Sequence, residues 1–263
     1  MNIRRYATAV VLAFLLIVTG CKAADTPLAG KALDSLAGKS AATEERLSTA
    51  AANAIAEGKT DEALALYERL YTRNSAGFSA PGGPFQEIAL NYAQLLRKTG
   101  KAQRALAVLS PFLEVRHGHT EIKIDTIILN EYAAINIELG NLEKAEEILN
   151  RVLADEKAKR FHGDAYNLLG IALDAQGKHK EAEQLFRKSL TLWKGEETSV
   201  MNNLAVCLAS QGRFDESLML LNQALVMAPE KQEIARNSQM VKDLRESIVP
   251  KPPVETPQKK QKK

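Results

Sequence analysis

Histidine and cysteine are the residues of this chain that could bind a metal ion or act as nucleophiles, and there are few of them. The four histidines are His117, His119, His162 and His179, and the two cysteines are Cys21 and Cys207. His117 and His119 are separated by one glycine, but no cysteine or carboxylate cluster accompanies them at the spacing of a zinc site. His162 and His179 fall at expected helix boundaries, where polar residues are common. We therefore expect no metal site.

Catalytic motifs of other kinds do not stand out either. The glycines punctuate expected helices and form no phosphate-binding loop, and no serine lies in a nucleophile-elbow sequence. Cys207 lies in the apolar run NLAVCLA, where a free cysteine behaves as a small buried side chain. The sequence therefore predicts that the chain is not an enzyme and uses no cofactor.

The charge of the chain is concentrated at its ends. The net charge is +3, and the last fourteen residues, PKPPVETPQKKQKK, hold five lysines against one glutamate, while Arg4 and Arg5 lie at the start. The residues between these ends are net negative. A nucleic-acid-binding domain normally carries its basic residues on a folded face, so we expect no nucleic-acid partner.

Residues 1–20 predict a signal peptide. Arg4 and Arg5 precede an apolar stretch from about Ala7 to Val18, which is too short to span a bilayer comfortably. The stretch ends in Val18-Thr19-Gly20-Cys21, which resembles the lipobox of bacterial lipoproteins. In that family the peptidase cuts before the cysteine, whose thiol carries the lipid. The resemblance implies that Cys21 is lipidated and that a covalent lipid is the only attached group.

The resemblance to bacterial lipoproteins also implies a location. Several acyl chains anchor a protein stably to a membrane, and the residue after Cys21 is Lys22, not the aspartate that retains lipoproteins in the inner membrane. We therefore expect an outer-membrane, periplasmic protein. Residues 21–43 are rich in alanine, glycine, serine and lysine and predict a flexible tether.

A sequence repeat fills the middle of the chain. Five glycines, each followed by a short polar turn, recur at intervals of 35 to 42 residues: Gly58, Gly100, Gly140, Gly177 and Gly212. Seven residues before each glycine and five after it stands a small residue, for example Gly170 and Ala182 around Gly177. Small residues at both positions predict two antiparallel helices that approach closely, with the glycine ending the first helix.

The repeat resembles the tetratricopeptide repeat, best in residues 163–194 and 199–229, where Pro229 closes the last copy. We expect an all-α solenoid of about five helix pairs, because stacked pairs bury a common core. The pairs are expected near residues 44–75, 86–113, 126–155, 163–194 and 199–229, within a solenoid of 44–248. Residues 230–248 predict a capping helix whose apolar stripe includes Ile234, Val241, Leu244 and Ile248. Residues 249–263 predict a disordered basic tail, which either contacts anionic surfaces or keeps this end solvated.

A set of amides marks a candidate protein-binding groove. In a tetratricopeptide stack the first helix of each pair lines a groove, and asparagine stands ten residues before three successive turn glycines. An amide offers donors and an acceptor, which suits an extended peptide backbone; alternatively these asparagines cap loops or bond neighbouring helices. The predicted groove residues are Asn91, Gln94, Asn130, Ala134, Asn167, Ile171, Asn202 and Val206.

The last two repeats and the segment IARNSQMV (234–241) most resemble TadD, the lipoprotein family of tight-adherence (Flp) pilus assembly. The resemblance implies a non-enzymatic role in assembling or localising the outer-membrane secretin, with the secretin or another pilus subunit as partner. Three alternatives remain: a type IV pilus pilotin, a component of the outer-membrane protein insertion machinery, and a scaffold for periplasmic cell-wall hydrolases.

Overall fold

The computed structural model describes residues 43–75, 84–113, 125–192 and 197–248. The chain divides into two structural units, Met1–Ala76 and Gly77–Lys263. The expected signal peptide (1–20), the lipidation site Cys21, nearly all of the tether and the basic tail (249–263) lie outside the described residues. Those expectations therefore remain predictions.

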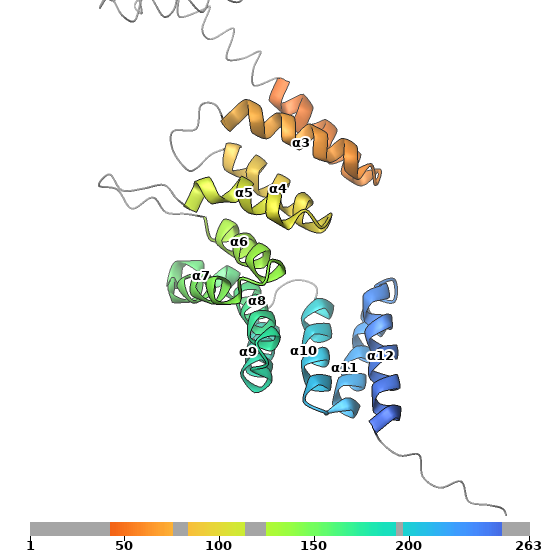
Figure 1. Cartoon of the computed structure of the whole chain (residues 1–263). Coiled ribbons are helices and arrows are strands. Elements are labelled where there is room, and N and C mark those ends of the chain that lie inside the picture. Colours follow the sequence, from red (N-terminus) through yellow and green to blue (C-terminus); the bar gives the residue numbers. More distant parts are fainter. Residues whose placement is uncertain (1–42, 76–83, 114–124, 193–196, 249–263) are drawn as a thin grey trace, which may run out of the picture. The chain divides into compact units, whose positions relative to one another are not determined.

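The described part of the first unit is one antiparallel helix pair. It consists of a helix over residues 43–56 and of α3 (Thr60–Ser75), which Figure 1 shows in orange. The small residues Ala51 and Ala63 are fully buried, and so is Leu70. Small residues at these positions let two helices approach closely, as the repeat pattern predicts.

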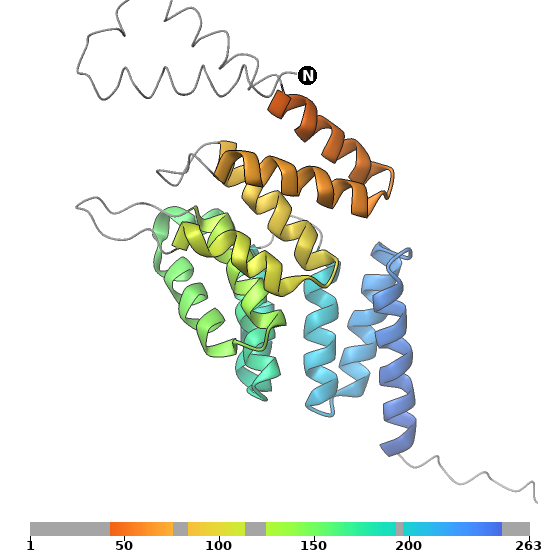
Figure 2. The same cartoon turned by 45° about the horizontal axis from the view of Figure 1, so that its top comes forward.

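In the second unit, the described residues form four helix pairs, a short 3₁₀ helix and a terminal helix (Figures 1 and 2). The pairs are α4 (Pro84–Lys98) with α5 (Ala102–Leu113), α6 (Thr126–Glu138) with α7 (Leu142–Ala154), α8 (His162–Ala175) with α9 (His179–Leu192), and α10 (Thr198–Ser210) with α11 (Phe214–Met227). The 3₁₀ helix η2 (Glu156–Phe161) precedes α8, and α12 (Gln232–Ile248) follows α11.

The same turn ends the first helix of every described pair. The turn glycines have φ between 71° and 78°, a conformation that glycine adopts without the steric penalty of a β-carbon. The residue after each glycine donates its N–H to the carbonyl five residues earlier, as in Lys178 to Leu173 at 2.9 Å and Arg213 to Leu208 at 2.9 Å. These bonds satisfy carbonyls at the helix end, so each turn closes a hairpin.

Two apolar clusters hold the later pairs together. One extends from α6 to α10 and includes Leu149, Phe186 and Leu204; the other joins α10, α11 and α12. Because each helix pair buries its apolar face against its neighbours, the core is continuous along this part of the stack. The expectation of an all-α fold of stacked helix pairs with a capping helix is thus confirmed.

The cap is less deeply packed than its stripe of apolar residues suggests. Ile234 and Val241 of α12 are buried, whereas Leu244 is 42% and Ile248 59% exposed. Of the α12 residues, Ile234 and Val241 belong to the apolar cluster with α10 and α11. Only the first half of the predicted stripe therefore contributes to the core.

Candidate functional site

A pocket of about 350 Å³ lies between the first helices of three consecutive pairs, α4, α6 and α8. This volume is at the lower end of the roughly 300–1,000 Å³ range of ligand pockets. Four of the eight predicted groove residues line it: Gln94, Asn130, Ala134 and Asn167. The repeat pattern placed these residues at matching positions of successive helices, and the structure brings their side chains to one cavity.

Six further lining residues were not singled out by the sequence: Arg97, Ile127, Glu131, Phe161, Asp164 and Leu168. Arg97 and Glu131 form an ion pair across the pocket, with 2.6 Å between Nε and Oε1. Nη1 of Arg97 also donates to Glu138 at 2.7 Å. One guanidinium thus links α4 to two carboxylates of α6. The repeat pattern did not reveal this pair, because Arg97 lies three residues before Gly100 whereas Glu131 lies nine residues before Gly140.

Asn130 has an incompletely satisfied side chain at this pocket. The residue is 8% exposed, and its Nδ2 lies 3.5 Å from the carbonyl oxygen of Phe161, at the outer limit of a hydrogen bond. Its Oδ1 is buried and accepts no hydrogen bond from the described residues. A buried acceptor without a donor costs about 1–3 kcal/mol, so this amide is a poor choice for stability alone.

The other two asparagines of the predicted series bond to the next repeat. Oδ1 of Asn167 accepts from Nδ2 of Asn203 at 3.0 Å, and Oδ1 of Asn202 accepts from Nδ2 of Asn237 at 2.8 Å. These bonds connect α8 with α10 and α10 with α12. They match the alternative in which the asparagines bond neighbouring helices, although Asn167 also lines the pocket.

The remaining predicted groove residues do not line this pocket. Asn91, Ile171, Asn202 and Val206 are half-buried, and Ile171 packs against the core cluster of α6 to α10. The pocket therefore includes one predicted groove residue on α4, two on α6 and one on α8.

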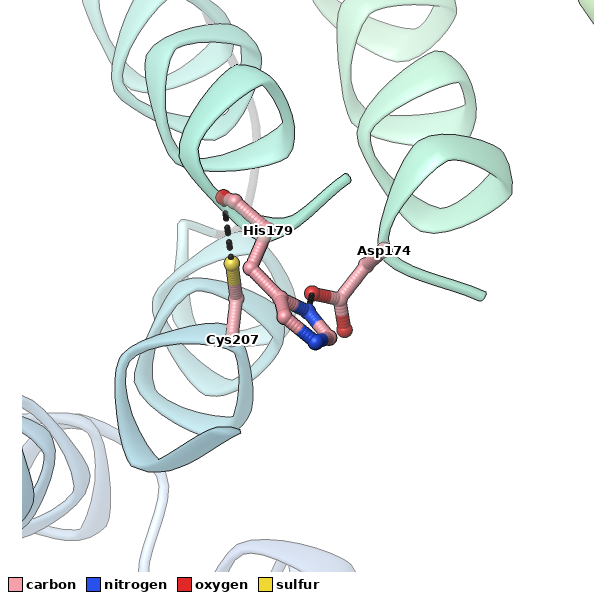
Figure 3. A group of neighbouring side chains, drawn as sticks. All are labelled: Asp174, His179 and Cys207. Carbon is pink, nitrogen blue, oxygen red and sulfur yellow. Dashed lines mark hydrogen bonds and ion pairs between the residues drawn. The ribbon is translucent and has the colours of Figure 1, made fainter. Parts of the chain in front are cut away.

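A second group of reactive side chains lies at the turn between α8 and α9, where Asp174, His179 and Cys207 converge (Figure 3). Nδ1 of His179 lies 2.7 Å from Oδ1 of Asp174. The Cys207 thiol, on α10, donates to the backbone carbonyl of His179 at 3.2 Å. The sequence did not predict this cluster because Cys207 is 28 residues from His179 along the chain.

The chemistry of this cluster is limited by Cys207. The ligand atoms of the three residues lie within 4.8 Å of one another, so a metal ion is a conceivable occupant. However, Cys207 is fully buried, and burial together with the nearby carboxylate of Asp174 raises the pKa of its thiol to about 12. Thiolate is the form that ligates metals and attacks electrophiles. The arrangement thus favours a neutral thiol that links α10 to the preceding turn.

The other histidines fall in two groups. His162 is 8% exposed, and its Nε2 lies 3.1 Å from the backbone carbonyl of Asp155, so it helps to fix the start of α8. His117 and His119 lie outside the described residues.

Comparison with known proteins supports the assignment of the repeat. Residues 125–195 and residues 198–228 match two family models, both described as tetratricopeptide repeat. The helix pairs from α6 to α11 therefore match the tetratricopeptide-repeat models. Such repeats stack into extended binding surfaces for other proteins.

Particular relatives are distant. A thermophilic tetratricopeptide-repeat protein of Thermus thermophilus is 21% identical with a TM-score of 0.58, over 75% of this chain and 98% of that one. A tetratricopeptide-repeat protein from Parabacteroides merdae is 22% identical with a TM-score of 0.50, over 76% of this chain and 73% of that one. These likenesses show the fold.

A curated relative by sequence is Protein SULFUR DEFICIENCY-INDUCED 1 of Arabidopsis thaliana. It is 24% identical over an alignment of 156 residues, and the match covers 51% of this chain and 49% of that protein. The chain thus spans about half the length of this relative.

None of the helices in the described ranges has both the length and the apolar character needed to cross a membrane.

Proposed function

We propose that this chain is a non-enzymatic protein-binding scaffold that holds a segment of its partner in the pocket of α4, α6 and α8. One observation carries the proposal: side chains from three consecutive repeats line a single cavity of about 350 Å³. A binding site built from several repeats suits an extended segment, because each repeat supplies one position along it.

Hydrogen bonds between the helices that line the pocket support this role. The bonds of Arg97 with Glu131 and Glu138 tie α4 to α6, and the bond between Asn167 and Asn203 ties α8 to α10. A preformed site loses less conformational entropy on binding than one that must be ordered.

We further propose that the scaffold is lipidated at Cys21 and acts at the periplasmic face of the outer membrane in assembly of a tight-adherence (Flp) pilus. The support is the lipobox-like sequence Val18-Thr19-Gly20-Cys21 and the resemblance of the last repeats to TadD. The partner is then the secretin or another pilus-assembly subunit.

The test of the binding role is site-specific photocrosslinking in cells. A photoreactive amino acid replaces Gln94 or Leu168, which line the pocket, or Val226, which is 84% exposed on α11. We expect crosslinks to one protein from the two pocket positions and not from Val226. Equal crosslinking from all three positions would show that the partner does not bind specifically at the pocket.

The test of the assembly role is the amount of denaturant-resistant secretin multimers in cell envelopes with and without the chain. We expect loss or mislocalisation of the multimers without it, with restoration by the original sequence but not by Cys21→Ser. Normal multimers without the chain would contradict the pilus-assembly role while leaving the binding role open to the crosslinking test.

A further inference from the structure

The pocket of α4, α6 and α8 has a charge balance that points to its ligand. Three of its lining residues are charged: Arg97, Glu131 and Asp164. The charge of Arg97 is already neutralised by Glu131 at 2.6 Å and is shared with Glu138. Asp164 makes no ion pair or side-chain hydrogen bond with the described residues. The pocket therefore presents one carboxylate that lacks a cation.

Asp164 is an exposed residue, so its carboxyl is accessible to a ligand, although the surrounding helices shield part of it from water. Partial burial raises the pKa of its carboxyl above the usual 3.8, because removal of water disfavours the charged form. A cation placed beside Asp164 would reverse this effect, since an opposite charge within about 4–6 Å favours ionisation. The carboxylate is therefore better suited to a positively charged ligand group than to an anionic one.

Asn130 lines the same cavity and has an acceptor atom that is buried in its present orientation. The 3.5 Å contact of its Nδ2 with the carbonyl of Phe161 is weak and fixes the orientation of the amide poorly. Its Oδ1 has no donor among the described residues. An ammonium or guanidinium group carries several N–H donors and no acceptor. Such a group would pair with Asp164 and, once the amide of Asn130 turns its Oδ1 toward the cavity, would donate to this oxygen as well.

The apolar part of the lining suits the stem of such a group. Ile127, Ala134 and Leu168 line the pocket together with the polar residues. Lysine and arginine place their methylene stems on apolar surface while the charged end reaches polar partners.

We infer that this pocket binds the side chain of a lysine or arginine in an extended segment of the partner protein. The inference rests on the proposed function, because it specifies what the protein-binding pocket recognises. The basic group pairs with Asp164 and donates to Oδ1 of Asn130, while its stem contacts the apolar walls. Arg97 keeps Glu131 neutralised, so Asp164 selects the charge of the ligand.

The experiment selects peptides from a random phage-displayed library on the full chain and measures the affinity of a selected peptide by fluorescence anisotropy. We expect a lysine or arginine at one position of the selected peptides. Asp164→Asn should weaken binding about fivefold to tenfold, a change on the order of 1 kcal/mol, and higher salt should weaken binding to the original sequence more than to the variant. The matched control is Glu181→Gln, an exposed acidic residue on α9 outside the pocket.

A charge reversal makes the test specific. Asp164→Arg should bind the selected peptide poorly and should recover affinity when the basic residue of the peptide is replaced by glutamate. Peptides that bind without a basic residue, or whose affinity is the same for Asp164→Asn, would overturn the inference.

The proposed function has its own control in the same assay. Gln94→Trp and Leu168→Trp narrow the pocket from two different helices, so a folding failure of one leaves the other informative. If these variants lose binding but the selected peptides show no preference for lysine or arginine, the inference is refuted and the proposed protein-binding role of the pocket stands. Selected peptides that bind both narrowed variants as tightly as the original sequence would overturn both.

Discussion

Gly170 on α8 lies against the ring of Phe186 on α9, so closely that a β-carbon at Gly170 would stand 2.7 Å from Cε1 of the ring. Phe186 is 1% exposed, and both residues lie in the same helix pair. The other repeats place alanine at the position of Gly170, but in the pair of α8 and α9 the aromatic ring takes the space of the missing methyl group.

Gly170→Ala should lower the free energy of unfolding by about 1–3 kcal/mol. The added methyl group overlaps a buried ring, and overpacking of a tight core costs about this much. Urea denaturation followed by circular dichroism measures the effect. In the double variant Gly170→Ala with Phe186→Leu, part of the loss should be recovered, since leucine leaves room for the methyl group.

The control for this prediction is Gly140→Ala. Gly140 has φ 78° and open space where a β-carbon would stand, so this variant isolates backbone strain, about 1–2 kcal/mol. Removal of the ring should not rescue Gly140→Ala. If Phe186→Leu restores both variants equally, the contact with Phe186 is not the cause of the Gly170 effect.

Two asparagines on α6 should respond in opposite ways to replacement by leucine. Asn130 has an unsatisfied Oδ1, so Asn130→Leu should leave stability unchanged or raise it by up to about 1 kcal/mol. It should nevertheless weaken peptide binding at the pocket.

Asn136 is the matched control on the same helix. Its Nδ2 donates to the carbonyl of Tyr132 at 2.8 Å, and its Oδ1 accepts from Asn141 at 3.2 Å. Asn136→Leu should cost about 1–3 kcal/mol because it leaves the amide of Asn141 without this acceptor. Thermal unfolding of both variants checks the contrast, and an equal loss of stability would assign Asn130 a purely structural role.

Glu183 on α9 should contribute stability that depends on pH. It accepts from Arg187 at 2.8 Å, from Arg213 at 2.6 Å and from Gln211 at 3.1 Å. Burial opposes its ionisation, but these hydrogen bonds outweigh burial and lower the pKa of Glu183 below its usual 4.5. Glu183→Gln should therefore cost about 1–2 kcal/mol at pH 7.

A depressed pKa in the folded state fixes the direction of the pH effect. The contribution of Glu183 is complete above the pKa of the unfolded chain and is lost as pH falls through the lower pKa of the folded state. The difference between the original sequence and Glu183→Gln should thus shrink below about pH 4.5. Glu181→Gln, an exposed neighbour, should show little change; a constant difference between pH 7 and pH 3 would contradict the assignment.

Cys207 should react with iodoacetamide at pH 8 at least about a hundredfold more slowly in the folded chain than in denaturant. The thiol is buried and its pKa is about 12, so little thiolate is present. The measurement uses the Cys21→Ser variant, in which Cys207 is the one remaining thiol. Titration with Co²⁺ tests the alternative, because a thiolate-to-cobalt absorption band that disappears in His179→Ala would identify the cluster with Asp174 as a metal site.

Features that recur in each repeat could be predicted from the sequence. Contacts between particular side chains of different repeats could not. A glycine at the position of Gly177 and a small residue at that of Ala182 recur in every repeat. The helical hairpin that these residues form was therefore predictable from the sequence. Asn130 was likewise found from its position relative to Gly140. The pairing of Arg97 with Glu131 depends on how two repeats face each other, which the pattern within one repeat does not specify.

The cluster of Asp174, His179 and Cys207 shows the same limit. Each residue had an adequate local explanation as part of a turn or of an apolar run. Their convergence depends on the packing of α10 against the turn between α8 and α9, which is a tertiary contact. The stripe of α12 shows a related limit, because periodicity indicates the apolar face of a helix but not how much of that face is buried.

The amide bonds between alternate helices have a consequence for how this chain could change in length during evolution. Asn167 receives its hydrogen bond from Asn203, and Asn202 receives one from Asn237, 36 and 35 residues further along the chain. Deletion of the unit that contains α10 and α11 would bring Oδ1 of Asn167 opposite Nδ2 of Asn237. Duplication of that unit would add one more hydrogen bond between two asparagine side chains. The same hydrogen bond would thus be available at the new junction after either event.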